Sequence, residues 1–212
     1  MSEAAKIHLV KVAREMNRSG LNQGTSGNLS VRSDDGMLIT PSGLPYEHME
    51  PADIVFVDAA GRPGNGARPS SEWRIHHDVY AARADAGAIL HAHPVHSTAL
   101  ACLNRSIPAF HYMVAAAGGR GIPCAPYATF GSQALSDNVV SALRGVRACL
   151  MANHGLLTLA HSLDNALALA TEVEQLARSY LQCLAVGEPV ILDDEEMDRV
   201  LEKFKTYGQQ SR

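Results

Sequence analysis

The sequence is short of positive charge, of cysteine pairs and of long apolar runs, and each shortage excludes a class of protein. Its 212 residues carry 18 basic and 22 acidic side chains, for a formal net charge of −4. This balance argues against nucleic acid as a partner, because duplex binders usually carry a basic patch. Apolar runs such as Ala115–Ala117 and Ile54–Val57 are far too short to span a bilayer, so no membrane is expected as a partner. The four cysteines form no Cys-x-x-Cys pair, which indicates neither a disulfide framework nor a zinc ribbon.

Lysine is missing from the whole middle of the chain. The lysines lie only near the two ends, at Lys6, Lys11, Lys203 and Lys205. Chemistry that needs a buried central lysine, such as a Schiff base with a carbonyl substrate, therefore has no obvious candidate. The N-terminus also has no basic region followed by an apolar stretch, so we expect no secretory signal and a cytoplasmic location.

Enough apolar material is present for one sizeable core, since hydrophobic residues make up 46% of the chain and charged residues 19%. We find no linker composition and therefore treat residues 1–212 as a single domain. Apolar periodicity predicts helices over 3–18, 72–83, 97–103, 162–186 and 194–206, and strands over 29–32, 37–40, 54–58, 88–93, 148–152 and 156–159. Turn residues between the first three strands predict antiparallel hairpins. The expected fold is α/β, with a mainly antiparallel central sheet covered by helices.

A His-x-His pair closes one of the buried strands. Alternate residues of a strand point to the same face, so the imidazoles of His91 and His93 should converge. Glu72 and His154 are the candidate carboxylate and third imidazole, and such a set suits zinc or another late divalent metal. The alternative is a pair of core histidines that satisfy their own hydrogen bonds, and the motif alone does not decide between the two.

Short motifs rich in serine and glycine offer backbone amides and hydroxyls without positive charge. They are Thr25–Asn28, Thr40–Gly43, and Ser70 with Ser71 at the start of a predicted helix, where either serine could act as the cap. Glycine turns and a helix N-terminus can bind a phosphate. Each motif taken singly is also typical of an ordinary turn.

Together these motifs resemble the class II aldolase/epimerase family. The resemblance rests on Gln23–Asn28, Thr40–Gly43, Pro69–Trp73, His91-x-His93 and Asn153–Gly155. It runs from about residue 5 to residue 208. The flanking residues Ala92, Pro94 and Asn153 depart from the family pattern, but no ligand position is lost.

The resemblance implies a role for each candidate residue. Zinc, or manganese or cobalt in its place, would be held by Glu72, His91, His93 and His154, with Glu72 acting also as the acid/base. The phosphate would be bound by Gly27, Asn28, Ser42, Gly43, Ser70 and Ser71. Tyr112, as a catalytic proton donor and acceptor, and Tyr207 would reach an active site at a subunit boundary of a homotetramer, and Phe130 would line the aldehyde side. His76 and His77 are interpreted as structural or surface residues.

The implied activity is that of a zinc-dependent aldolase acting on a phosphorylated sugar. It would reversibly cleave a ketose 1-phosphate, with L-fuculose 1-phosphate as the expected substrate, to dihydroxyacetone phosphate and L-lactaldehyde through a metal-stabilised enediolate. Cleavage of 5-deoxyribulose 1-phosphate or 5-methylthioribulose 1-phosphate is the alternative, because only a few residues read the distal substituent. A pentulose-5-phosphate 4-epimerase is disfavoured, since residues 112–123 contain no acidic side chain. A non-catalytic binding module is disfavoured by the complete set of candidate ligands.

Overall fold

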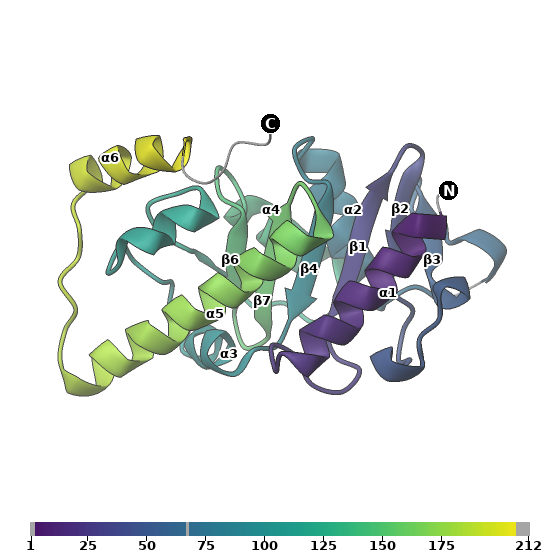
Figure 1. Ribbon diagram of the computed structural model, residues 1–212, viewed down its shortest axis with the longest axis horizontal. Coiled ribbons are helices and arrows are strands. Elements are labelled where there is room, and N and C mark those ends of the chain that lie inside the picture. The colour runs from purple at the N-terminus through teal and green to yellow at the C-terminus, as the bar shows by residue number, and fades with distance from the viewer. Residues whose placement is uncertain (1–2, 67, 207–212) are drawn as a thin grey trace.

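One seven-stranded sheet organises the computed structural model, which describes residues 3–66 and 68–206 (Figure 1). The strands lie in the order β3-β2-β1-β4-β7-β6-β5. Every neighbouring pair is antiparallel except β5 and β6, which confirms the mainly antiparallel sheet. The strands are β1 (Asn28–Ser33), β2 (Gly36–Ile39), β3 (Val55–Asp58), β4 (Ala88–Ala92), β5 (Cys124–Ala125), β6 (Ala148–Met151) and β7 (Gly155–Ala160).

Helices cover both faces of this sheet. The α-helices are α1 (Glu3–Arg18), α2 (Trp73–Ala82), α3 (Val95–Cys102), α4 (Gln133–Ala142), α5 (Leu163–Val186) and α6 (Asp194–Phe204). Short 3-10 helices are η1 (Tyr46–His48), η2 (Pro51–Asp53), η3 (Gly64–Gly66) and η4 (Tyr112–Ala117). Figure 1 shows α1 and α5 crossing the near face, with α2 and α4 behind the sheet. No helix in the described ranges is both long enough and apolar enough to cross a membrane.

The alternation of side chains along the strands divides the core into two layers. In β4, Leu90 belongs to the layer under α1 and α5, whereas Ile89 belongs to the layer under α2 and α4. In β2, Leu38 and Met37 divide in the same way. Each large apolar side chain that is fully buried contributes about 1.5–3 kcal/mol by leaving water, so both layers hold the central strands in place.

Most expected elements are confirmed, with differences at the less periodic ones. The predicted helices over 3–18 and 162–186 match α1 and α5, and the Ser162 hydroxyl accepts the Asn165 N–H at the start of α5. The sequence patterns do not predict α4, which buries few apolar side chains, or β5, which has two residues. The expected serine cap of α2 is wrong in detail. The N-cap is Glu72, and the Ser70 hydroxyl accepts the Glu72 N–H rather than a helical one.

Candidate active site

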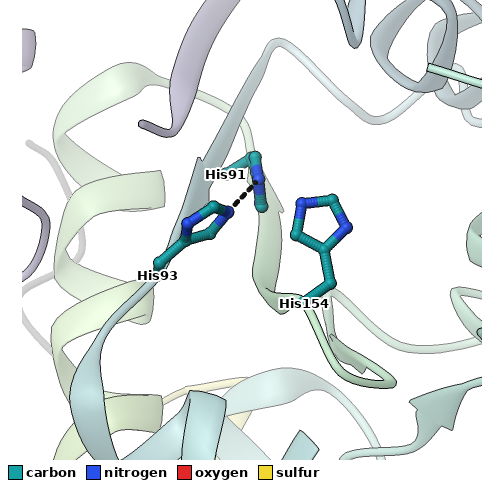
Figure 2. Close-up of side chains that lie close together, drawn as sticks. All are labelled: His91, His93 and His154. Carbon is teal, nitrogen blue, oxygen red and sulfur yellow. Dashed lines mark hydrogen bonds between the residues drawn. The ribbon is translucent and has the colours of Figure 1, made fainter. Parts of the chain in front are cut away.

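Three imidazoles meet at one end of the sheet (Figure 2). His91 lies in β4 and His93 just beyond it, and their Nε2 atoms are 3.0 Å apart, as expected from their spacing. His154 lies in the turn between β6 and β7, where Asn153 adopts a positive φ of 53°. The ligand nitrogens of all three side chains lie within 4.8 Å of one another. The structure therefore brings together the three histidines named from the sequence.

Glu72 reaches the same point from the start of α2. Its side chain is buried, with Oε2 3.1 Å from His91 Nε2 and Oε1 3.2 Å from His154 Nε2. The Asn28 amide donates to Oε2 across 3.1 Å. Oε1 makes no hydrogen bond in the described part of the structure, although it is shielded from solvent.

The charges of these groups depend on one another. Burial alone would raise the pKa of Glu72, but the facing His91 and His154 imidazoles and the Asn28 amide outweigh it, so the carboxyl stays ionised. Burial opposes a charge on His91 too, yet Glu72 outweighs burial and raises the pKa of His91. Burial and the neighbouring imidazoles lower the pKa of His93 and of His154 to about 4 in each case. The site thus holds one carboxylate among imidazoles of which at least two are neutral at pH 7.

The arrangement of donors fits a divalent metal ion. His91 Nδ1 donates to the Leu156 carbonyl across 2.9 Å, so in neutral His91 the Nε2 lone pair is directed at Glu72 Oε2 and His93 Nε2. A divalent cation among these atoms would take the place of a proton on His91 Nε2 and would pair with the Glu72 carboxylate. The orphaned Glu72 Oε1 is a second acceptor that lacks a donor. Three imidazole nitrogens and one carboxylate are a donor set typical of zinc and other late divalent metals.

A cleft of about 380 Å³ opens beside this cluster. It is lined by Thr25, Ser26, Gly27, Asn28, Pro41, Ser42, Gly43, Ser70, Ser71, Glu72, His93, Tyr127, Ala128, Phe130, Asn153 and His154. Gly27 has a φ of 73°, and a Cβ there would lie 2.7 Å from the His91 carbonyl oxygen, so only glycine fits so close to β4. No lysine or arginine in the described ranges lines the cleft, whose far wall offers serine hydroxyls and turn amides instead.

Most of the expected site residues lie together, but Tyr112 does not. The cleft contains the expected Gly27, Asn28, Ser42, Gly43, Ser70, Ser71 and Phe130. Tyr112 lies instead in a separate groove between η4 and α6, beside Phe110 and Leu192, and its side chain is half exposed. Tyr207 lies outside the described residues. The described lining of the cleft in one chain therefore does not include Tyr112.

Several residues that shape the site were missed by sequence reasoning. Tyr127 lines the cleft near Phe130, and the aromatic residues of the stretch 122–131 were its only signal. Asn22 is buried, and its Oδ1 accepts the His93 N–H. Glu174 of α5 accepts the backbone N–H groups of His96 and Ser97, which pins the start of α3 directly after His93. No spacing rule joins Asn22 or Glu174 to residues more than 70 positions away.

An α/β sheet that gathers three imidazoles and a carboxylate at a strand end defines a candidate metal-dependent enzyme. Residues 7–181 match the model of the family described as "Class II Aldolase and Adducin N-terminal domain". The chain belongs to this family.

Similar proteins extend along nearly the whole chain. An L-fuculose phosphate aldolase of Escherichia coli K12 is 56% identical over 201 residues, covering 94% of each chain. A 5-methylthioribulose-1-phosphate/5-deoxyribulose-1-phosphate aldolase of Rhodospirillum rubrum is 54% identical over 205 residues, covering 97% of this chain and 93% of that protein. A solved structure of L-fuculose 1-phosphate aldolase superposes with a TM-score of 0.94 at 43% identity, covering 97% and 98% of the two chains. The chain is thus an aldolase, and aldolases are lyases.

Proposed function

We propose that this aldolase is zinc-dependent and reversibly cleaves a ketose 1-phosphate, L-fuculose 1-phosphate being the first candidate, to dihydroxyacetone phosphate and an aldehyde, here L-lactaldehyde. One observation carries the proposal. Glu72, His91, His93 and His154 converge at one end of a cleft whose other wall is made of serine and glycine turns. The metal-binding end of the cleft suits the carbonyl of a substrate. The opposite wall, which is rich in backbone amides and carries no charged side chain, suits the phosphate of the same substrate.

The three histidines and Glu72 would hold the metal, with zinc preferred by donor type and manganese or cobalt as substitutes. When bound, the metal supplies Lewis-acid stabilisation of the negative charge that develops on the substrate oxygens as the carbon–carbon bond breaks. Glu72 would move the proton. Asn28 holds Oε2, while the orphaned Oε1 is free to take a proton from, or give one to, the carbon of the three-carbon fragment.

The phosphate would bind at the wall formed by the two glycine turns and the start of α2. Gly27 and Gly43 both have a positive φ, which lets the backbone of Gly27, Asn28, Ser42 and Gly43 curve around an anion. Ser70 and Ser71 lie at the N-terminal end of α2, where the helix dipole favours negative charge. This set would bind phosphate without lysine or arginine.

The aldehyde end of the substrate would face aromatic side chains. Phe130 and Tyr127 line the cleft and are about two-thirds exposed, at 66% and 61%. A methyl-bearing or thioether-bearing substituent would pack against them. Tyr112 would exchange a proton with the oxygen of the departing aldehyde from a neighbouring chain, since it lies outside the cleft of its own chain.

Assembly follows from the same proposal. Exposed aromatic side chains at Tyr112, Tyr127 and Phe130 suit burial against another copy of the chain, and a homotetramer would complete each site with Tyr112 and Tyr207 of a neighbour. We place this enzyme in the cytoplasm. The bacterial relatives act on phosphorylated sugars by name, and phosphorylated metabolites are retained there.

A second substrate is supported by a specific comparison. The Rhodospirillum rubrum relative, at nearly the same identity as the Escherichia coli one, carries the name of a 5-methylthioribulose-1-phosphate and 5-deoxyribulose-1-phosphate aldolase. These substrates share the phosphate end with L-fuculose 1-phosphate and differ at the aldehyde end, which would face Tyr127 and Phe130 of the cleft.

A panel of ketose 1-phosphates tests the function. Purified protein, with and without chelator, is assayed for release of dihydroxyacetone phosphate from L-fuculose, 5-deoxyribulose and 5-methylthioribulose 1-phosphates. We expect turnover of at least one, lost on chelation and restored by zinc. Borohydride with dihydroxyacetone phosphate should leave the enzyme active, because no lysine in the described ranges lines the cleft. Lack of cleavage of every substrate by the zinc-loaded protein would contradict the proposal, and a lysine trapped by borohydride would contradict its mechanism.

A further inference from the structure

A column of buried polar side chains runs behind Glu72 and away from the cleft. On α2 and its N-cap, Glu72, His76 and Tyr80 recur every fourth residue and so share one face of the helix. On β1, Asn28 and Ser30 are two residues apart and share the face of the strand that α2 covers. All five residues are buried. Helix and strand spacing thus join them into one layer.

Hydrogen bonds connect the whole column. Tyr80 Oη lies 2.8 Å from Ser30 Oγ, and Ser30 Oγ lies 2.7 Å from His76 Nδ1. His76 Nε2 lies 2.5 Å from Asn28 Oδ1, and Asn28 Nδ2 lies 3.1 Å from Glu72 Oε2. Every polar atom between Tyr80 and Glu72 therefore has a partner in a single chain of contacts.

The ionised Glu72 sets the direction of this chain. A carboxylate only accepts, so the Asn28 NH₂ group must face it, and Asn28 Oδ1 must face His76. His76 Nε2 therefore carries the proton and donates to Asn28, which leaves Nδ1 to accept from the Ser30 hydroxyl. Ser30 in turn accepts from Tyr80. His76 is completely buried and, since burial lowers its pKa to about 3, it stays neutral in this tautomer.

We propose that His76 is a positioning residue for the reaction, which orients the Asn28 amide so that its NH₂ group faces Glu72 and the cleft. Without this donor, Asn28 Oδ1 is unpaired when the NH₂ group faces Glu72. In the flipped orientation, Asn28 Oδ1 faces the Glu72 carboxylate, which only accepts. With it, one N–H of Asn28 holds Glu72 Oε2, and the other is left for a ligand in the cleft. His76 does not line the cleft and acts only through Asn28.

The burial of an imidazole at this place supports such a role over simple packing. His76 lies between the apolar residues Ile75 and Val79 of the same core layer, where a leucine would fill a similar volume. Burying a polar ring costs free energy unless its hydrogen bonds are made, and both of its nitrogens make short ones here. Connected buried polar groups specify one geometry, which an apolar side chain would not do.

Three substitutions at position 76 distinguish the effect of the N–H donor from the effect of side-chain volume. His76→Gln can still place an N–H donor near Asn28 Oδ1, whereas the shorter His76→Asn reaches only toward Ser30, and His76→Leu offers no donor. Removal of the hydrogen-bonding partner of a metal ligand, here Asn28, costs about 10–100-fold in activity or metal affinity, and loss of the His76 donor would turn Asn28 away from Glu72. We expect that loss in kcat/KM for His76→Asn and His76→Leu, and rescue to within a few-fold of wild type by His76→Gln.

The matched control is the next residue on the helix. His77 contacts Asp78 and the Ala59 carbonyl, away from the column, so His77→Gln should leave kcat/KM unchanged. Unfolding midpoints of all variants show which of them fold. If His76→Leu does not fold, the Gln and Asn variants alone decide, and equal activity of those two would overturn the proposal.

A double-mutant cycle with Asn28 excludes a general structural role. If His76 acts only through Asn28, a His76 substitution should cost less than about twofold in an Asn28→Ala background. The same 10–100-fold loss in both backgrounds would overturn the proposal.

Zinc affinity of the same variants, measured by competition with a chelator, gives a second readout. The measurement of kcat/KM rests on the proposed function, but the measurement of zinc affinity does not. We expect weaker zinc binding in His76→Leu than in His76→Gln, even if no ketose 1-phosphate in the panel is cleaved. Equal zinc affinity and equal activity of these two folded variants would overturn the positioning role while leaving the proposed function intact.

Discussion

The two faces of the sheet are held by different kinds of core. Under α1 and α5 the core is largely apolar, as at Leu9 and Leu90, and its buried hydroxyls make single local contacts, Thr158 with the Ala166 carbonyl and Ser97 with Glu174. Under α2, apolar residues flank the connected polar column that ends at Glu72. Apolar burial is non-directional and stabilises many packings about equally well, whereas buried hydrogen bonds accept one geometry. The first face therefore mainly provides stability, and the polar column of the second face orients Glu72.

The largest expected effect on turnover comes from Glu72→Gln, at the end of the polar column. An amide fills the same space and can lie beside the histidines, but it cannot take a proton. We expect the variant to keep its fold and much of its metal and to lose about 10²–10⁴-fold in kcat. Steady-state kinetics with metal analysis on the same sample measure this. Near-normal turnover in a fully metallated variant would refute the role of Glu72.

On the apolar face, Leu9→Ala should affect stability and leave the chemistry intact. Leu9 of α1 is fully buried and does not line the cleft. The cavity and the lost burial should lower the free energy of unfolding by about 2–5 kcal/mol, measured by denaturant titration. Turnover per folded chain should not change. A loss of kcat without a loss of stability would erase the distinction between the two faces.

Acid should lower the free energy of unfolding of the metal-free protein, because buried histidines of the site and of the polar column must take up protons. The pKa values of His93 and His154, about 4, and of His76, about 3, lie below the ordinary histidine value of 6.5. The unfolded chain therefore binds more protons between about pH 4 and 6.5, and stability falls as the pH drops through that window, by at most about 1.4 kcal/mol per pH unit for each histidine. His91, whose pKa is raised, acts in the opposite direction.

Denaturant titration of the chelated protein at pH 7 and pH 5 measures this effect. His93→Gln, which removes one of the shifted groups, is the control and should show a shallower dependence. Equal stability of the wild-type protein at the two pH values would contradict the assigned protonation states.

The smallest expected signal is a partial recovery of activity between two defective chains. If Tyr112 serves the site of a neighbour, Tyr112→Phe and Glu72→Gln chains are defective in different halves of a shared site. After they are unfolded together and reassembled, some interfaces should pair two intact halves and regain part of the activity. No recovery in proven mixed assemblies would place Tyr112 outside its neighbour's site. Assemblies of each variant alone provide the baseline.

The sequence predicts those features that follow from local periodicity. The spacing of His91 and His93 on one strand, and the apolar period of α5, led directly to elements that the structure confirms. Glu72 and His154 were joined to that pair as candidates, and the structure brings them together.

Partners distant in the sequence could not be predicted in this way. Glu174 of α5 accepts N–H groups at the start of α3, and Asn22 accepts the N–H of His93, which lies 71 positions further along the chain; only the folded structure creates these contacts. His76 is an intermediate case. Its four-residue spacing from Glu72 and Tyr80 is visible in the sequence, but the pairing of that helix face with Asn28 and Ser30 requires the tertiary structure.

The central claim is that Glu72 and the three histidines of this site bind one metal ion per chain and that turnover depends on this ion. The direct test is to strip the protein with chelator, add zinc back in steps, and measure bound metal and cleavage of the best ketose 1-phosphate on the same samples, with His91→Ala as the control. The account predicts no turnover in the stripped protein, turnover that rises in proportion to bound zinc and reaches its limit at one zinc per chain, and neither zinc nor turnover in His91→Ala. Full turnover by metal-free protein, or full zinc content in His91→Ala, would contradict it.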